Sequence, residues 1–196
     1  MVLPNATLFP HSLLPLHIFE PRYRAMLEWS LERQRMFCIA LMKPGVTEAH
    51  SPSDFHHVAG LGLVRACRGS ADGTSNLILQ GLARVRLAGF LQDRPFRIAE
   101  IREVRSSTAD PAETDLLRAK LLDVCAQARL HGLELPQALE AHLAKLGDSE
   151  VLADIVAHTF LRDPYRRQEI LEQAETAERL RTLIRHLHRE LSDNDA

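Results

Sequence analysis

The chain has 196 residues, of which 45% are hydrophobic and 26% charged, and its formal net charge at pH 7 is −2. This balance is typical of a soluble globular protein and excludes a strongly basic molecule that would attract nucleic acid or anionic lipid as a whole. The sequence holds no apolar run near the ~18 residues of a membrane span. Pro4, Pro10 and Pro15 interrupt any signal-peptide helix near the amino terminus.

The cysteines indicate neither a disulfide framework nor a zinc site. Cys38, Cys67 and Cys125 are odd in number, lie far apart and form no C-x-x-C pair. Two of them fall in apolar runs and the third on an apolar helix stripe. We therefore expect thiols that pack as small hydrophobic groups rather than nucleophiles, in a reducing, cytoplasmic location.

The ten histidines give no metal-binding pattern either. His50, His56 and His57 cluster in a polar loop, whereas His186 and His188 lie two positions apart in an expected helix and do not share a face. No H-E-x-x-H sequence occurs, and neither cluster reaches the ligand count of a structural zinc site. We expect surface histidines, with no metal and no cofactor.

Short apolar runs separated by turn residues predict strands in the first half of the chain. The runs span residues 36–42, 58–67, 76–80, 84–87 and 96–104. Gly, Pro and Asp residues separate several of them, at 43–45, 70–73 and 93–95. This pattern favours an antiparallel β-barrel or sandwich, and Gly60 and Gly62 fit the sharp bends that close a small barrel.

One helix is expected within this half, over residues 20–34. Pro21 lies in its first turn, where proline is tolerated, and no helix breaker follows. Four apolar residues recur at helical spacing and form one stripe: Tyr23, Met26, Leu27 and Leu31. The pattern predicts an amphipathic helix inserted among the strands.

The apolar spacing changes to a helical period near residue 110. Asp110, Pro111 and Glu113 form an N-cap, an N1 proline and an N3 glutamate, and Gly132 is a plausible stop for the helix that they begin. Asp148 or Ser149 caps the third of the later helices. These further helices are expected over residues 133–146 and 151–161, from Asp163-Pro164 onward, and from Thr176 onward.

Short amphipathic helices cannot each bury an apolar stripe alone, so they should pack as a bundle. The sequence thus predicts an α+β fold with two subdomains and a tail. The expected ranges are 1–108 for the β-barrel subdomain, 109–191 for the helical bundle and 192–196 for a polar, disordered tail.

Several motifs follow one another in an order found in a known family. Phe9-Pro10 precedes L-H-I-F-E-P-R-Y-R-A-M at 16–26, V-A-G-L-G at 58–62, D-G at 72–73 and L-Q-G-L-A-R-V-R at 79–86. In the helical half, L-A-D-I-V-A at 152–157 precedes R-Q at 167–168, I-L-E at 170–172 and E-R-L at 178–180. Together they resemble the N-terminal domain of Lon-type ATP-dependent proteases over roughly residues 3–191. The F-E-P-R-Y block is fairly specific, while an Ala inserted before Gly60 departs from the family's V-G-x-x-G/A pattern.

The resemblance implies a small PUA-like β-barrel joined to a helical bundle, and a role in selecting unfolded or degron-bearing polypeptides. In full-length Lon this unit precedes an ATPase and a Ser-Lys peptidase. Here no G-x-x-x-x-G-K-[ST] loop exists to hold phosphates, and Lys43, Lys120 and Lys145 lack a recognisable peptidase context. We therefore expect a stand-alone, non-enzymatic polypeptide-recognition module.

The expected polypeptide-binding residues lie near the junction of the N-terminal loop and the first helix: Leu13, Leu14, Phe19, Glu20, Arg22 and Tyr23. The apolar members would contribute to an exposed patch or groove between barrel and bundle, and the polar ones would face a groove that receives a peptide. A structural alternative stays open. In it the leucines anchor the loop, Glu20 favours the positive end of the helix dipole, Arg22 pairs with a carboxylate and Tyr23 packs.

Two other functions and self-association also stay open. PUA-like barrels often bind RNA, but the near-neutral charge and the presence of only two tyrosines for stacking argue against nucleic acid. Arg84 and Arg86 share a strand face by the two-residue period and are expected to form an exposed ladder rather than an RNA contact. No set of residues supports a small-molecule enzyme. Helix stripes shared across a two-fold axis would give a weak homodimer.

Overall fold

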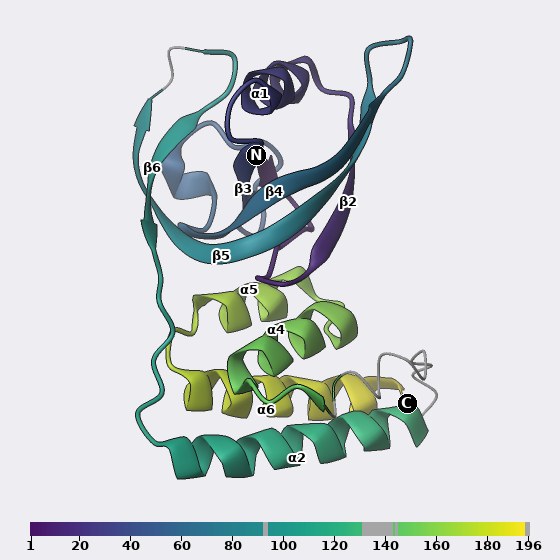
Figure 1. Ribbon diagram of the computed structural model, residues 1–196, viewed down its shortest axis with the longest axis vertical. Coiled ribbons are helices and arrows are strands. Elements are labelled where there is room, and N and C mark those ends of the chain that lie inside the picture. Colours follow the sequence, from purple (N-terminus) through teal and green to yellow (C-terminus); the bar gives the residue numbers. More distant parts are fainter. Residues whose placement is uncertain (92–93, 131–142, 144, 195–196) are drawn as a thin grey trace. The chain divides into compact units, whose positions relative to one another are not determined.

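The computed structural model describes residues 1–91, 94–130, 143 and 145–194, and the chain divides into two compact units (Figure 1). Unit 1 spans Met1–Val104 and contains the sheet, and unit 2 spans Arg105–Ala196, in which the described elements are helices. The fold is therefore α+β, as the sequence predicts. Within the described part of the chain, each helix is too short or too polar to span a lipid bilayer.

Unit 1 is built on a six-stranded sheet. Its strands are β1 (Val2–Leu3), β2 (Leu13–Ile18), β3 (Met36–Leu41), β4 (Val58–Gly69), β5 (Ser75–Leu91) and β6 (Ile98–Glu103). The strand order is β1-β3-β4-β5-β2, and β6 pairs with β5 beside this path. Neighbouring strands are antiparallel, except that β1 runs parallel to β3, so the sheet is mixed rather than purely antiparallel.

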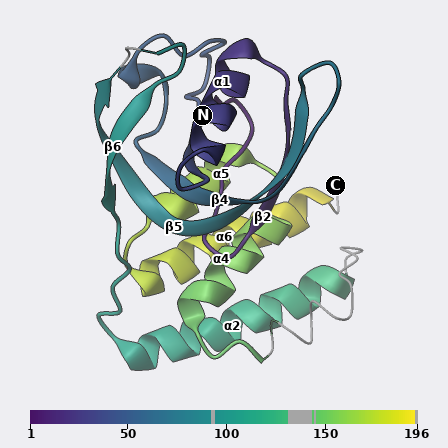
Figure 2. The same cartoon turned by 45° about the horizontal axis from the view of Figure 1, so that its top comes forward.

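The sheet does not close into the PUA-like barrel that the sequence predicts. Among the described strands, β6 pairs with β5 alone and β1 with β3 alone. Figures 1 and 2 show β5 as one strongly curved strand, with β2 near one end and β6 near the other. Closure would need pairing along the outer edge of β1, but β1 has two residues and the outward groups of Val2 already bind the Tyr23 hydroxyl. The barrel prediction is therefore not confirmed.

Gly60 and Gly81 permit close backbone approach. A Cβ at Gly60 would overlap the carbonyl oxygen of Leu8, and a Cβ at Gly81 would overlap that of Phe9. The segment before β2 therefore crosses β4 and β5 at positions where only glycine fits. Gly81 N also donates to Ser12 O at 2.9 Å, which fixes the start of β2. The prediction that Gly60 serves a barrel-closing bend is replaced by this packing role.

The observed strands differ from the predicted ones in two places. The N-terminal loop expected before the first helix contains β2, which pairs with β5 over its whole length. The apolar runs 76–80 and 84–87 belong to the single strand β5, which continues through Gly81 because β4 stays paired on both sides of it. The turn expected at 93–95 falls partly outside the described residues.

Helix α1 (Pro21–Leu31) lies on the concave side of the sheet (Figure 1). Tyr23, Met26 and Leu27 are buried in one core with residues from five strands, namely Ile18, Phe37, Ile39, Val64, Leu77, Leu79 and the partly buried Leu3. A 3-10 turn, η1 (Pro52–Asp54), lies between β3 and β4. Burial of the stripe holds the start of α1 beside the end of β2.

The described part of unit 2 contains the helices α2 (Pro111–Leu130), α4 (Ser149–Phe160), α5 (Pro164–Glu172) and α6 (Thr176–Asn194). Asp110, Asp148 and Asp163 accept hydrogen bonds from first-turn amides of α2, α4 and α5, at 3.1, 2.8 and 2.7 Å. Carboxylates at these positions satisfy amides that have no partner inside the helix. These helix starts agree with the sequence predictions.

Two predictions for unit 2 fall partly outside the described residues. The helix expected over 133–146, with the stop at Gly132 before it, lies outside the described residues except for positions 143 and 145. Helix α6 includes Ser192–Asn194, three residues that the sequence assigns to the polar tail, and residues 195–196 lie outside the description.

Candidate functional site

Strand β2 exposes apolar side chains on one face of the sheet. Leu14, Leu16 and Ile18 face the core of unit 1, as the two-residue period of a strand requires. The alternate positions form what we call the outer stripe: Leu13, Pro15, His17 and, directly after the strand, Phe19. Leu13 is 55% exposed and Phe19 is 61% exposed, so the stripe offers large apolar side chains to solvent.

The outer edge of β2 also carries unpaired backbone groups. β2 is the last strand of the sheet path, and its ladder joins it only to β5 in the described part of the chain. Gly81 N donates to Ser12 O and Gly81 O accepts from His11 N, so the Ser12 carbonyl points toward β5. Because the direction of the backbone groups alternates along an antiparallel strand, those of Leu13, Pro15 and His17 point to the outer edge. Proline therefore occupies an edge position where no ladder hydrogen bond is lost.

A shallow groove of about 460 Å³ lies beside the stripe. Pro15 and His17 line it from β2, Ile78 from β5 and Ala66 from β4. His17 stacks on Phe19 with ring centroids 5.9 Å apart, and its Nδ1 lies 2.9 Å from Asn76 Oδ1. The stripe is thus a fixed surface of mixed apolar and amide character.

The polar residues predicted for the site make contacts within unit 1. Arg22 Nε donates to Glu20 Oε2 at 2.8 Å, and a second nitrogen of Arg22 lies 3.4 Å from Glu48 Oε1. Tyr23 Oη donates to Val2 O at 2.8 Å and accepts from Val2 N at 3.3 Å, and burial is the main cause that raises the Tyr23 pKa. The structure therefore brings Leu13 and Phe19 to one exposed face, and gives Glu20, Arg22 and Tyr23 local partners.

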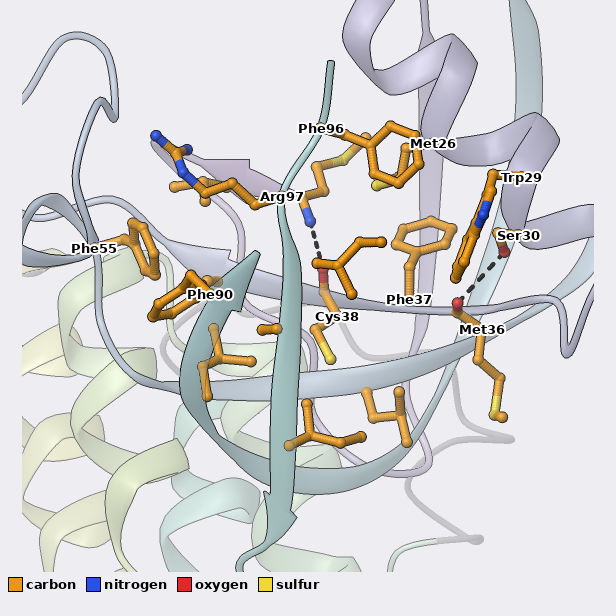
Figure 3. Close-up of a pocket in the computed structure, with 18 of the residues that line it drawn as sticks. Met26, Trp29, Ser30, Met36, Phe37, Cys38, Phe55, Phe90, Phe96 and Arg97 are labelled. Carbon is orange, nitrogen blue, oxygen red and sulfur yellow. Dashed lines mark hydrogen bonds between the residues drawn. The ribbon is translucent and has the colours of Figure 1, made fainter. Parts of the chain in front are cut away.

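A second feature, a cavity of about 330 Å³ in unit 1, was not anticipated from the sequence (Figure 3). It lies between the two sheet edges that fail to pair: Val2 of β1 and Ile98, Ala99 and Ile101 of β6 all line it. Most of its remaining wall is aromatic or sulfur-containing, formed by Met26, Trp29, Met36, Phe37, Cys38, Phe55, Phe90 and Phe96. These residues come from α1, β3, β5 and loops, so no local sequence pattern joins them.

Few polar side chains line this cavity, among them Ser30, Gln34 and the cation Arg97. Trp29 Nε1 is buried and has no hydrogen-bond partner among the described residues, a costly state for a donor. The guanidinium groups of Arg33 and Arg94 lie 4.3 and 5.8 Å from the centroid of the Trp29 ring. Arg97 lines the cavity and donates to Ala49 O at 2.9 Å.

The thiols pack as the sequence predicts. Cys125 is buried on α2, and burial raises its pKa to about 12. Burial also raises the pKa of Cys38, which together with Cys67 packs half-buried against the cores of unit 1. A thiol with a raised pKa holds little thiolate at neutral pH and is a poor nucleophile. Within the described residues, no three His, Cys, Asp or Glu side chains converge as metal ligands would.

Two solved structures share this fold. The N-terminal domain of a Mycobacterium avium complex Lon protease matches with a TM-score of 0.72 and 17% sequence identity, covering 96% of each chain. A Lon N-terminal domain protein from Xanthomonas campestris matches with a TM-score of 0.66 and 17% identity, covering 94% of this chain and 95% of that one. The fold class is that of a Lon N-terminal domain.

Sequence comparison gives the family. The family model of the ATP-dependent protease La (LON) substrate-binding domain matches residues 1–189, and the chain belongs to this family. Lon protease of Desulfosudis oleivorans is 24% identical over 192 residues, which are 97% of this chain and 24% of that protein. Lon protease of Desulfovibrio desulfuricans is 28% identical over 191 residues, which are 95% of this chain and 21% of that protein. The chain thus spans about a quarter of the length of the Lon proteases that it matches, and the resemblance predicted from the motifs is confirmed.

Proposed function

We propose that this chain is a non-catalytic polypeptide-recognition module that binds unfolded or degron-bearing polypeptides through the outer stripe of β2. The observation that carries the proposal is the pair of large, exposed apolar side chains, Leu13 and Phe19, on one face of an edge strand. Membership of a substrate-binding domain family makes a polypeptide the first partner to consider.

Physical complementarity supports this partner. An unfolded chain exposes apolar side chains together with backbone N–H and C=O groups, which a folded partner has largely buried. The outer stripe offers apolar surface, and the outer edge of β2 offers backbone groups at Leu13 and His17 for strand addition. Binding would remove both from water, which is favourable for apolar area and for paired backbone groups.

The absence of catalysis is part of the proposal. The family match concerns the substrate-binding domain, and the sequence has no phosphate-binding loop. The cysteines, all free, fit a reducing, cytoplasmic location. In this role the chain would hold or present polypeptides and leave their covalent structure unchanged.

The test is binding of fluorescently labelled, reduced casein to the purified chain, followed by anisotropy. The double variant Leu13→Ser, Phe19→Ser should weaken binding by about tenfold or more, because burying one such side chain contributes about 1.5–3 kcal/mol. Leu116→Ser is the matched control, since Leu116 is a similarly exposed leucine (71%) on α2 of unit 2. Absence of binding to several unfolded polypeptides at high micromolar concentration would remove the proposal.

A further inference from the structure

We propose that the cavity between β1 and β6 is a second binding site, which takes one large apolar side chain of an extended polypeptide segment that pairs with the outer edge of β6. The segment would carry an acidic residue two positions from this apolar anchor, on the same strand face. The inference rests on the proposed polypeptide recognition and names a site and a sequence preference that the outer stripe does not supply.

The two strand edges that border the cavity differ in whether their backbone groups are free to pair. The edge of β1 is closed, because the Tyr23 hydroxyl occupies both the N–H and the C=O of Val2. The edge of β6 has no such cap: in the described part of the chain its backbone pairing is with β5. An extended segment can therefore add to β6 and cannot pair equally with β1.

On β6, the backbone groups of Ile101 can pair with an added strand. Val104 N donates to Arg84 O at 3.0 Å, which makes Val104 and Arg84 a hydrogen-bonded pair. Hydrogen-bonded and non-hydrogen-bonded pairs alternate along antiparallel strands, so the N–H and C=O of Ile101 point away from β5. Ile101 is also 44% exposed and lines the cavity. The same residue thus offers backbone pairing and borders the apolar space.

The size and wall of the cavity determine which side chain it accepts. Its volume of about 330 Å³ and its wall of Phe, Met and Trp side chains suit an aromatic or long aliphatic group (Figure 3). In the described part of the chain the buried Nε1–H of Trp29 lacks an acceptor, and a carbonyl of an inserted segment would supply one.

Two arginines near the cavity favour an acidic residue in the bound segment. Arg97 lines the cavity, and Arg94 lies over the Trp29 ring. Arg97 lies on the Phe55 side of the cavity, 5.9 Å from the centroid of that ring. Neither Arg94 nor Arg97 forms an ion pair with a carboxylate of the described residues, whereas Arg33, the other cation over the Trp29 ring, lies 3.5 Å from Glu32. An acidic residue two positions from the apolar anchor lies on the same face of an extended segment, so it would meet one of these guanidinium groups, and a basic residue there would be repelled.

Trp29 provides a direct readout, because it is the only tryptophan of the chain and forms part of the cavity wall. We would titrate the full chain with unlabelled peptides of about ten residues, the length of a sheet strand. The first peptide alternates Thr and Val and has a central Phe with Glu two positions before it, on the same strand face. The second has Lys in place of Glu, and the third has Ser in place of Phe. Saturable change in Trp29 emission is expected with the first peptide, and about tenfold weaker binding with each of the others.

The matched variants are Ile101→Pro, which removes the outward N–H without breaking the β5 ladder, and Ile101→Val, which keeps it. Ile101→Pro should bind the first peptide about tenfold more weakly, and Ile101→Val within about twofold of the original chain. An unchanged thermal unfolding midpoint would show that Ile101→Pro is folded. If it unfolds, Ala99→Leu, which fills the cavity, serves in its place with the same expected loss.

Three results would each overturn the inference. The first is equal binding of the three peptides, and the second is a folded Ile101→Pro variant that binds the first peptide as tightly as the original chain does. The third is a change in Trp29 emission with decanoate but not with any peptide. Casein anisotropy separates this failure from that of the proposed function. If casein binds the original chain but the β6 variants bind the first peptide as tightly as the original chain does, the second site is wrong and polypeptide recognition stands. If casein does not bind the original chain, polypeptide recognition itself fails.

Discussion

The Tyr23 hydroxyl binds both backbone groups of Val2 that face the outer edge of β1. It donates to the carbonyl at 2.8 Å and accepts from the amide at 3.3 Å. Its ring is buried in the core of unit 1 beside Met26 and Leu27. Tyr23 therefore fastens the first strand to the first helix and closes one sheet edge. The F-E-P-R-Y motif thus contains a residue whose contacts are structural, whatever the motif does in recognition.

We predict that Tyr23→Phe lowers the free energy of unfolding by about 1–3 kcal/mol, because the substitution leaves the partly buried Val2 amide and carbonyl without a partner. Urea denaturation would measure the change. Tyr165→Phe is the control, since the Tyr165 side chain is 37% exposed on α5, and it should shift stability by less than about 0.5 kcal/mol. An equal loss in both variants would contradict the role given to the Tyr23 hydroxyl.

At the residue scale, the sequence predicts contacts best where the partners are near in the chain. The pairing of Arg22 with a carboxylate is one such structural alternative, and Arg22 contacts Glu20 two positions away. The sequence also predicts the packing of Tyr23 but not its partner Val2, which lies 21 positions away. Arg84 shows the limit. The predicted exposed ladder is correct for Arg86 but wrong for Arg84, which is 2% exposed. Strand periodicity assigns residues to a face but does not say what covers each position.

The helix starts of unit 2 depend on caps that adjoin them in sequence. Asp163 accepts from the amides of Tyr165 and Arg166, at 2.7 and 3.1 Å, and Pro164 occupies the first helical position, where its missing N–H costs nothing. Because all of these interactions span at most three residues, a single sequence is enough to predict them.

We predict that Asp163→Ala lowers the free energy of unfolding by about 1 kcal/mol, since two first-turn amides of α5 lose their acceptor. The measurement is the urea midpoint at unchanged m-value. Asp123→Ala, an exposed position inside α2, changes the same charge without removing a cap and should be neutral or slightly stabilising. A loss in Asp123→Ala as large as that in Asp163→Ala would argue against the capping role.

The strands were predicted less well because their pairing is not local. β3, β4 and β6 agree with apolar runs in the sequence, but β2 was expected to be a loop. Pro10 and Pro15 flank or interrupt this segment, and apolar residues occur on both of its faces, which hides the two-residue period. Its strand character comes from β5, some sixty residues away in sequence. The merging of two predicted strands into β5 has the same cause.

At the scale of the whole molecule, the motifs identified the family and the α+β class, since their order persists across the chain. The cavity near Trp29 could not be predicted, because its wall joins residues from α1, β1, β3, β5 and β6 that only the fold brings together. The open sheet was missed for a related reason: strand count alone does not show that the Tyr23 hydroxyl occupies the edge of β1. Apolar surface and unpaired strand edges in unit 1 are the basis of the proposed recognition of polypeptides.

Amide hydrogen exchange of the full chain, with and without saturating reduced casein, tests this account most directly. Backbone groups that pair with a bound segment exchange more slowly, so we predict new protection at Leu13–Phe19 and at Ile98–Glu103, with little change over α4 and α5. Protection confined to the helices of unit 2, or none at a casein concentration that saturates binding, would contradict a polypeptide site on the sheet.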